Sequence, residues 1–206
     1  MRRGAKPGKG KVKRKRPVSR TSRRNGGSRV RDLEKRLAEA LRDKAEAQEQ
    51  QAATAEILQA MRRSPADTQP VFDAIVSAAA RLLRADGGIL TRVAGELIEL
   101  AAFTSSGPAG DEGLRAGFPV SVHGTGSMQA ITVRGPAPFV STDFGTDERL
   151  NEGTRRRLAA RGFRSGAAVP LIDKGISIGA LSVTRRDPGA FAPDEIALLK
   201  TFPTRP

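Results

Sequence analysis

The sequence contains no cysteine and a single histidine, His123. The lack of cysteine excludes disulfides, thiolate nucleophiles and cysteine-bound zinc or cofactors, and it is typical of a reducing compartment. Long apolar runs are missing too, since no stretch approaches the roughly 18 residues of a membrane-spanning helix. The basic N-terminus is not followed by the apolar stretch of a secretory signal. We therefore expect a cytoplasmic chain without a transmembrane segment.

Acidic residues are absent from the first 31 positions. This segment holds 14 of the 36 Lys and Arg residues and none of the 22 Asp and Glu residues, so the remainder of the chain is electrically balanced. The segment also has almost no large apolar side chain, and it cannot bury enough surface to offset its ordering entropy. We expect residues 1–29 to form a disordered basic tail.

The tail offers cations to a nucleic acid or to an anionic surface. The candidates for polyanion binding are Lys11, Lys13, Arg14, Lys15 and Arg16. Each cation adds a salt-sensitive increment of affinity, but the tail has no aromatic residue that would stack on bases. The other interpretation is a solvated tail that binds polyanions weakly and without selection. A polyanion-binding or nucleic-acid-binding protein is thus the alternative function.

Residues 30–63 are rich in helix formers and contain neither glycine nor proline. Heptad spacing places a seam along the predicted helix, apolar at both ends and weak in its middle. The seam consists of Val30, Leu33, Leu37, Ala40, Lys44, Ala47, Gln51, Thr54, Leu58 and Met61. The pattern predicts a coiled-coil connector that pairs two copies into a homodimer. The alternative is a single surface helix supported by charge pairs.

Residues 64–206 have the pattern of one α+β domain. Pro70 suits the first turn of a helix with an apolar stripe, and Gly87 and Gly88 should end that helix. A hairpin is expected over residues 88–104 because two runs of strand formers flank a glycine turn. Residues 105–117 are predicted to be a polar connection.

The second half of this domain alternates short strands and helices. A short extended piece, a glycine-rich turn and a short helix ending at Arg134 are expected, followed by a strand around Phe139. The next predicted helix has its acids first, its arginines last and Gly162 beyond its end, which suits the helix dipole and a glycine cap.

The stretch "VPLIDKGISIGALSVTRR", residues 169–186, predicts two strands joined by a tight turn at Asp173, Lys174 and Gly175. Both faces of the second strand are partly apolar, which indicates a central strand covered on both sides. Gly179 interrupts it, and a glycine within a strand marks the close approach of a helix or a ligand.

Residues 165–202, "SGAAVPLIDKGISIGALSVTRRDPGAFAPDEIALLKTF", together with the upstream "EILQAMRRSPADTQPVFDAIVSAAARLL", resemble a GAF domain of the kind found in bacterial sensor histidine kinases. The "AVPL" and "IGALSV" strands and the aromatic residue before "PDEIALL" carry the resemblance, which spans residues 54–202. It implies an antiparallel sheet of five or six strands with helices on both faces and a small-molecule cavity on one of them. In the family the last helix continues to an output domain, so this chain resembles a truncated member.

The resemblance implies a sensory or regulatory module of a two-component system that binds a small molecule, dimerises or meets a signalling protein. Kinase catalysis is not expected, because His123 lies in a loop and no length remains for an ATP-binding domain. Reductases and bilin carriers of the GAF class use cysteine. No paired carboxylates, metal-ligand cluster or nucleophile with its base stands out. We therefore expect no enzyme, no catalytic residue and no metal, and the sequence identifies no cofactor.

Five polar residues are candidates for ligand binding: His123, Ser127, Thr142, Asp143 and Arg164. The motif "HGTGS", residues 123–127, presents backbone N–H groups to an anion at a helix start or else forms an ordinary turn. The other three flank the arginine-rich helix and are expected on the covered face of the sheet. Asp143 is equally suited to capping a turn or a helix.

Overall fold

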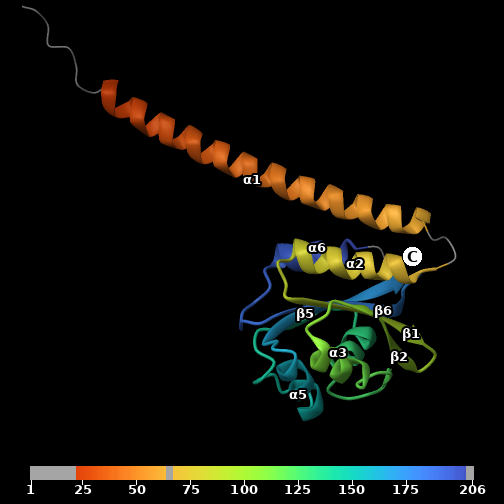
Figure 1. Ribbon diagram of the computed structural model, residues 1–206. Coiled ribbons are helices and arrows are strands. Elements are labelled where there is room, and N and C mark those ends of the chain that lie inside the picture. The colour runs from red at the N-terminus through yellow and green to blue at the C-terminus, as the bar shows by residue number, and fades with distance from the viewer. Residues whose placement is uncertain (1–21, 64–66, 203–206) are drawn as a thin grey trace, which may run out of the picture. The chain divides into compact units, whose positions relative to one another are not determined.

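The computed structural model describes residues 22–63 and 67–202 (Figure 1). The chain divides into two units, Met1–Ala47 and Gln48–Pro206. The five predicted polyanion-binding residues between Lys11 and Arg16 lie outside the described residues, so their role stays a prediction. Within the described part of the chain, no helix has both the length and the apolar content to cross a bilayer.

The helix α1 runs without a break over Ser22–Arg63. It thus begins within the segment predicted to be disordered, and it includes Gly26 and Gly27, which are poor helix formers. Each of these glycines costs roughly 1 kcal/mol relative to alanine, but extending an existing helix avoids the larger cost of nucleating a new one. The predicted connector is therefore longer at its N-terminal end than the sequence pattern indicated.

The core of the second unit is a six-stranded sheet in which all neighbouring strands are antiparallel. The strand order is β3-β2-β1-β6-β5-β4. The strands are β1 Gly87–Ala94, β2 Leu97–Phe103, β3 Val120–Ser121, β4 Phe139–Ser141, β5 Ser165–Asp173 and β6 Ile176–Arg185. The sheet confirms the predicted α+β fold and the central position of the strand that contains Gly179.

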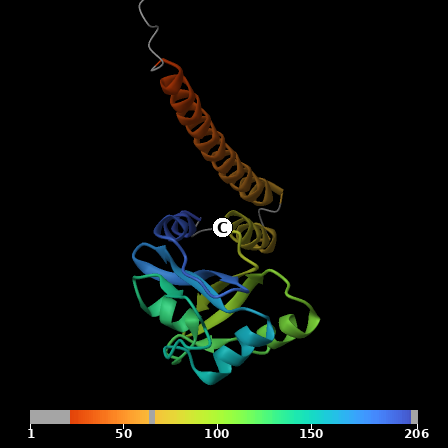
Figure 2. The ribbon, with the colours of Figure 1, turned by 90° about the vertical axis from the view of Figure 1, so that its left-hand side faces the viewer.

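Helices cover both faces of the sheet (Figure 2). One face carries α2 Gln69–Leu82 and α6 Pro193–Lys200, and the other carries α3 Pro108–Arg115, α4 Met128–Arg134 and α5 Glu152–Ala160. On the first face, Leu181 and Val183 of β6 belong to a core with Ile75 of α2. On the second face, Phe144 and Phe163 form a separate core with α4 and α5. The sheet is therefore buried on both sides.

Two glycines predicted to end α2 instead open β1. The helix ends at Leu82, and a Cβ on Gly87 would lie 2.5 Å from the ring of Phe163. A Cβ on Gly88 would lie 3.2 Å from Val76. Both glycines allow β1 to pass close to its neighbours, and this requirement arises from the packing of distant residues rather than from the local turn.

The helix α3 lies in the segment that was predicted to be a polar connection. Its sequence contains Gly110 and Gly113, which lower helix propensity, and its N-cap Gly107 provides no side-chain cap. Burial of Leu114 holds α3 on the sheet, and the carboxylate of Asp111 binds the loop before the helix. Tertiary contacts therefore override the local preference for a loop.

Candidate ligand site around α3

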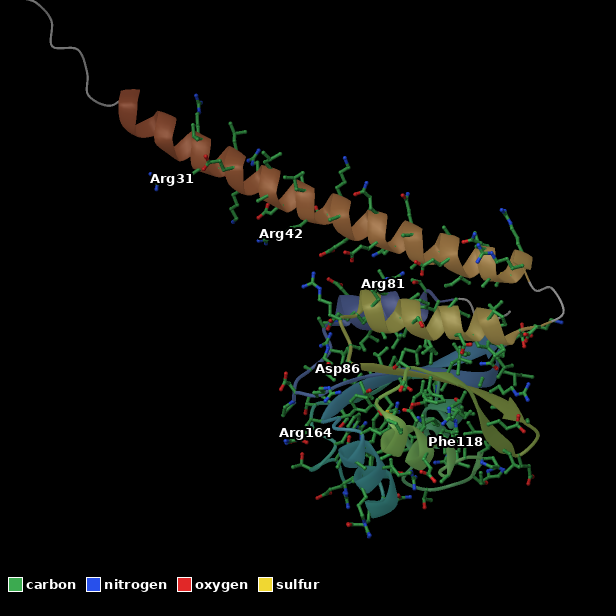
Figure 3. All side chains as sticks on the ribbon, in the orientation of Figure 1. Arg31, Arg42, Arg81, Asp86, Phe118 and Arg164 are labelled. Carbon is green, nitrogen blue, oxygen red and sulfur yellow. The ribbon has the colours of Figure 1, made fainter. Side chains whose placement is uncertain are left out.

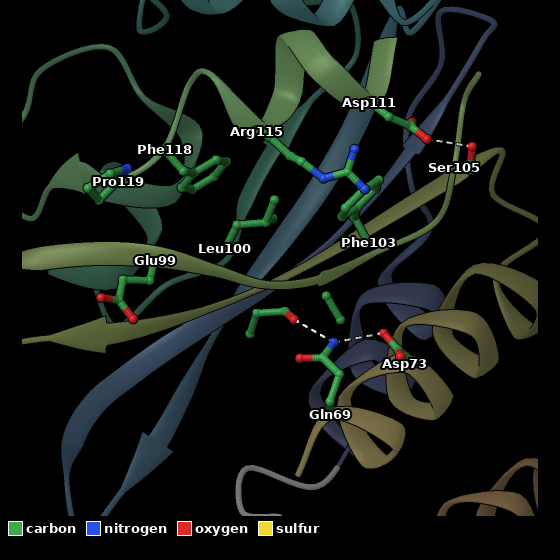
Figure 4. A pocket seen from close by; sticks show the side chains of 12 residues that line it. Gln69, Asp73, Glu99, Leu100, Phe103, Ser105, Asp111, Arg115, Phe118 and Pro119 are labelled. Carbon is green, nitrogen blue, oxygen red and sulfur yellow. Dashed lines mark hydrogen bonds between the residues drawn. The ribbon is translucent and has the colours of Figure 1, made fainter. Parts of the chain in front are cut away.

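The edge of the sheet next to α3 is open. One side of β2 pairs with β1, and within the described ranges the other side pairs with β3 only at Leu97 and Ile98, so the rest of that side has no strand beside it. A pocket of about 730 Å³ lies along this edge, which we call the outer pocket (Figure 4). Its lining residues are Gln69, Asp73, Glu99, Leu100, Ala101, Ala102, Phe103, Ser105, Asp111, Arg115, Phe118 and Pro119.

Polar contacts fix the α3 side of the outer pocket. Asp111 accepts hydrogen bonds from Ser105 Oγ at 2.6 Å and from the Ser106 N–H at 2.9 Å. These bonds, the one from Ser105 first, hold the pKa of Asp111 below its ordinary value. The guanidinium of Arg115 lies 4.8 Å from the centre of the Phe103 ring (Figure 4). The pocket thus combines a carboxylate, a cation and aromatic surface.

A glutamine closes the other side of the outer pocket. The Nε2 group of Gln69 donates to Asp73 at 3.0 Å and to the carbonyl oxygen of Ala101 at 2.9 Å (Figure 4). The first turn of α2 is therefore joined directly to the open strand. A molecule in this pocket would contact α2, β2 and α3 together.

A smaller cavity of about 40 Å³ lies under α3 on the covered face of the sheet, and we call it the inner cavity. Its apolar lining includes Ile89, Leu114, Phe118, Met128, Val120 and Leu158. Its polar lining consists of Ser127, Gln129, Thr154, Arg157 and Arg161. Phe118 lines both the outer pocket and the inner cavity, so the two are neighbours.

Arg161 is the most deeply buried charged group of the inner cavity, and the sequence did not single it out. Its side chain is 5% exposed, and it donates from Nε to Ser106 Oγ and from Nη2 to the carbonyl oxygen of Thr104, both at 2.9 Å. Burial lowers the pKa of Arg161, and the charge of Asp111 partly opposes this shift. The sequence does contain a signal for the burial of Arg161. Its spacing from Thr154 and Leu158 places the three residues on one helix face, so the arginine continues a buried stripe.

Ser127 is the predicted ligand residue that lines the inner cavity. It caps α4, since its Oγ accepts a hydrogen bond from the Ala130 N–H at 3.5 Å. His123 lies exposed in the turn after β3, where its N–H donates to Ser121 Oγ at 3.2 Å, and it lines neither hollow. The motif "HGTGS" therefore divides between a cavity wall and an exposed turn.

The other three predicted residues lie in the loop after β4 and at its base. Arg164 donates to Asp143 at 2.7 Å, which lowers the pKa of Asp143, and the Gly145 N–H donates to the same carboxylate at 2.9 Å. Asp143 thus caps a turn, as the second interpretation held. Thr142 is exposed, and none of the three lines either hollow. Arg164 lies well away from Phe118 (Figure 3). A role in ligand binding stays a prediction for these residues.

The same loop contains a second ion pair with a measurable consequence. Arg149 donates to Asp147 at 2.7 and 2.9 Å, and this lowers the pKa of Asp147 to about 2. Because the pKa of the folded state lies below the ordinary 3.8, the stabilisation is present above that value and is lost as the pH falls toward 2. We expect Asp147→Asn to flatten the dependence of unfolding free energy on pH between about 4 and 2.

Urea unfolding of the full chain at several acidic pH values measures this slope. The matched control is Glu148→Gln, which removes the adjacent exposed carboxylate and should leave the slope of the wild type. Equal slopes for Asp147→Asn and the wild type would show that the ion pair does not contribute to acid stability.

Comparison with known protein families identifies the domain. A model of the GAF domain matches residues 67–204. A search of curated protein sequences finds no match. No group of three His, Asp or Glu side chains in the described ranges could hold a metal ion.

Solved structures with a similar fold include GAF domains of several kinds of protein. The GAF domain of an Acinetobacter phosphoenolpyruvate-protein phosphotransferase is 14% identical, with a TM-score of 0.59 over 76% of this chain and 87% of that one. A GAF domain/HD domain protein from Geobacter sulfurreducens is 21% identical, with a TM-score of 0.55 over 65% and 85%. A domain described as that of a two-component sensor histidine kinase protein from Sinorhizobium meliloti is 18% identical, with a TM-score of 0.53 over 66% and 86%. These structures share the fold, and because the family model covers more than half of the sequence, the chain belongs to the GAF domain family.

Proposed function

We propose that the chain is a non-enzymatic sensory module of signal transduction that binds a small molecule beside α3 and dimerises through α1. The observation that carries the proposal is the outer pocket, whose volume of about 730 Å³ falls within the range of roughly 300–1,000 Å³ typical of small-molecule sites. Aromatic surface and charges of both signs converge in it. These groups suit an organic molecule with both apolar and polar parts.

The chemistry of the outer pocket favours binding over catalysis. The hydroxyl of Ser105 lies against the carboxylate of Asp111, but a carboxylate whose pKa is lowered is a weak general base near neutral pH. The one histidine, His123, does not line this pocket. A nucleophile activated by a suitable base is therefore not assembled among the described residues of the pocket.

The position of the pocket suggests how binding would reach the connector helix. The outer pocket touches Gln69 and Asp73 in the first turns of α2, and α2 follows α1 along the chain. A ligand shifts an equilibrium only by its differential affinity for two states. In this proposal the ligand favours one packing of α2 against β2. The first turn of α2 then changes position, and this movement is transmitted along the chain to α1.

Native mass spectrometry of the gently purified full chain tests the proposal. We expect a retained mass beyond that of the protein, which Leu100→Trp should abolish because Leu100 points into the outer pocket (Figure 4). The matched control is Leu97→Trp, on the same strand but outside the pocket and 43% exposed, which should keep the extra mass. A wild-type spectrum without any bound molecule contradicts the proposal.

A further inference from the structure

The guanidinium of Arg161 is buried with part of its hydrogen-bonding capacity unused. Its Nε and Nη2 groups have acceptors on Ser106 and Thr104, whereas Nη1 finds no acceptor among the residues that the structure describes. A buried donor left without a partner is costly, and more so when it carries charge. Because Arg161 lines the inner cavity, an acceptor placed in that cavity would complete its hydrogen bonds.

The charges around the inner cavity favour an anion. The charged residues in its lining are Arg157 and Arg161, and Arg157 donates to Thr154 at 3.3 Å. The carboxylate of Asp111 lines the outer pocket, where Ser105 and the Ser106 N–H donate to it, and it acts on Arg161 through its charge rather than as a lining group of the inner cavity. The inner cavity therefore carries two cations and no carboxylate of its own.

The size and the apolar wall of the inner cavity restrict the anion. A water molecule needs roughly 10–15 Å³ by this measure, so a cavity of about 40 Å³ admits about three such positions. The lining also includes the apolar side chains Leu114, Met128 and Leu158. A short carboxylic acid matches both parts, because its carboxylate meets the guanidinium and its carbon end meets the apolar side chains. Inorganic phosphate has no apolar part to place there.

The backbone of α3 covers these arginines closely. A Cβ on Gly110 would lie 3.2 Å from Cγ of Arg161, and a Cβ on Gly117 would lie 3.0 Å from Cδ of Arg157. The glycines thus let α3 and its end rest directly on the two side chains. Phe118 separates the inner cavity from the outer pocket, so a longer acid would extend past this ring.

We propose that the inner cavity binds the carboxylate of a small organic acid, with the free Nη1 group of Arg161 as its anchor. This inference rests on the proposed function, because it names the chemical class of the molecule that the module binds. It defines the inner cavity as the part that recognises charge and the outer pocket as the space for the remainder of a larger ligand.

The test uses acetate and its neutral isostere acetamide with the full-length wild-type chain at constant ionic strength. We expect saturable binding of acetate by titration calorimetry, a shift of the Arg161 guanidinium resonances in a ¹⁵N-arginine-labelled sample, and neither effect with acetamide or phosphate. This comparison needs no variant. Equal behaviour of acetate and acetamide, or unmoved Arg161 resonances, would overturn the inference.

A variant pair locates the binding. Arg161→Gln should weaken acetate at least about tenfold, because a charge-assisted hydrogen bond is lost. Arg156→Gln removes an exposed arginine of α5, the helix that ends just before Arg161, and should bind acetate like the wild type. Undiminished binding by a folded Arg161→Gln protein also overturns the inference. If native mass spectrometry finds a retained neutral molecule while acetate does not bind, the proposed function stands and only the carboxylate inference fails.

Discussion

Gly179→Ala is expected to lower the free energy of unfolding by about 3 kcal/mol, a large share of the roughly 5–15 kcal/mol that an ordinary domain has. Gly179 of β6 pairs with Arg92 of β1, and a Cβ at this position would lie 2.0 Å from the carbonyl oxygen of Thr91. That atom belongs to the backbone of the neighbouring central strand, which cannot move aside without disturbing the β1–β6 ladder.

The close neighbour of Gly179 is thus a strand, whereas the sequence pattern predicted a helix or a ligand. Denaturant unfolding followed by circular dichroism measures the loss. Gly113→Ala is the matched control, because a Cβ there meets nothing within 4 Å and alanine is the better helix former, so stability should stay or rise by up to about 1 kcal/mol. A Gly179→Ala protein as stable as the wild type would show that the β1–β6 ladder adjusts.

The second large effect concerns the oligomeric state. The double substitution Leu33→Glu with Leu37→Glu should raise the dissociation constant of the proposed homodimer at least about a hundredfold, since each buried leucine contributes roughly 1.5–3 kcal/mol. Both side chains lie on the predicted seam and are 63% and 61% exposed in the single chain. A partner helix would cover them, and two adjacent carboxylates would oppose that burial.

Sedimentation equilibrium measures this constant. The matched control, Lys35→Glu with Arg42→Glu, also adds two carboxylates to the helix but off the seam. Lys35 contacts Glu39 at 3.8 Å with both side chains exposed, a pair that contributes little, so the control should remain dimeric. A monomeric wild type would refute the dimer proposal, and a dimeric Leu33→Glu, Leu37→Glu protein would place the interface elsewhere.

The parts of the fold that were predictable depend on local chemistry. Both long hairpins turn at glycines with positive φ, Gly95 at 62° and Gly175 at 82°, and Gly162 follows α5 at 77°. These conformations favour glycine, so the sequence marks them directly. The helix α3 was not predictable in this way, because contacts with the sheet and the preceding loop hold a glycine-rich segment.

The candidate site was predicted only in part for a related reason. Ser127 could be found because a cap residue before a helix is a local signal. The placement of Arg161 depends on Ser106 and Thr104, which lie 55 and 57 positions earlier in the chain. No spacing rule connects residues so far apart. The sequence places Arg161 on the helix face of Thr154 and Leu158, but it does not indicate which groups the guanidinium meets there.

The open edge of β2 also bears on the solubility of the protein. An unpaired strand edge is a template on which another molecule can add a strand and begin aggregation. Here the amide of Gln69 already donates to the carbonyl oxygen of Ala101. The pairing of β1 with β2 is irregular between Leu90 and Thr91 of β1. The carboxylate of Glu99 also lines the pocket at this edge. The features that leave room for a small molecule therefore also discourage edge-to-edge association of sheets.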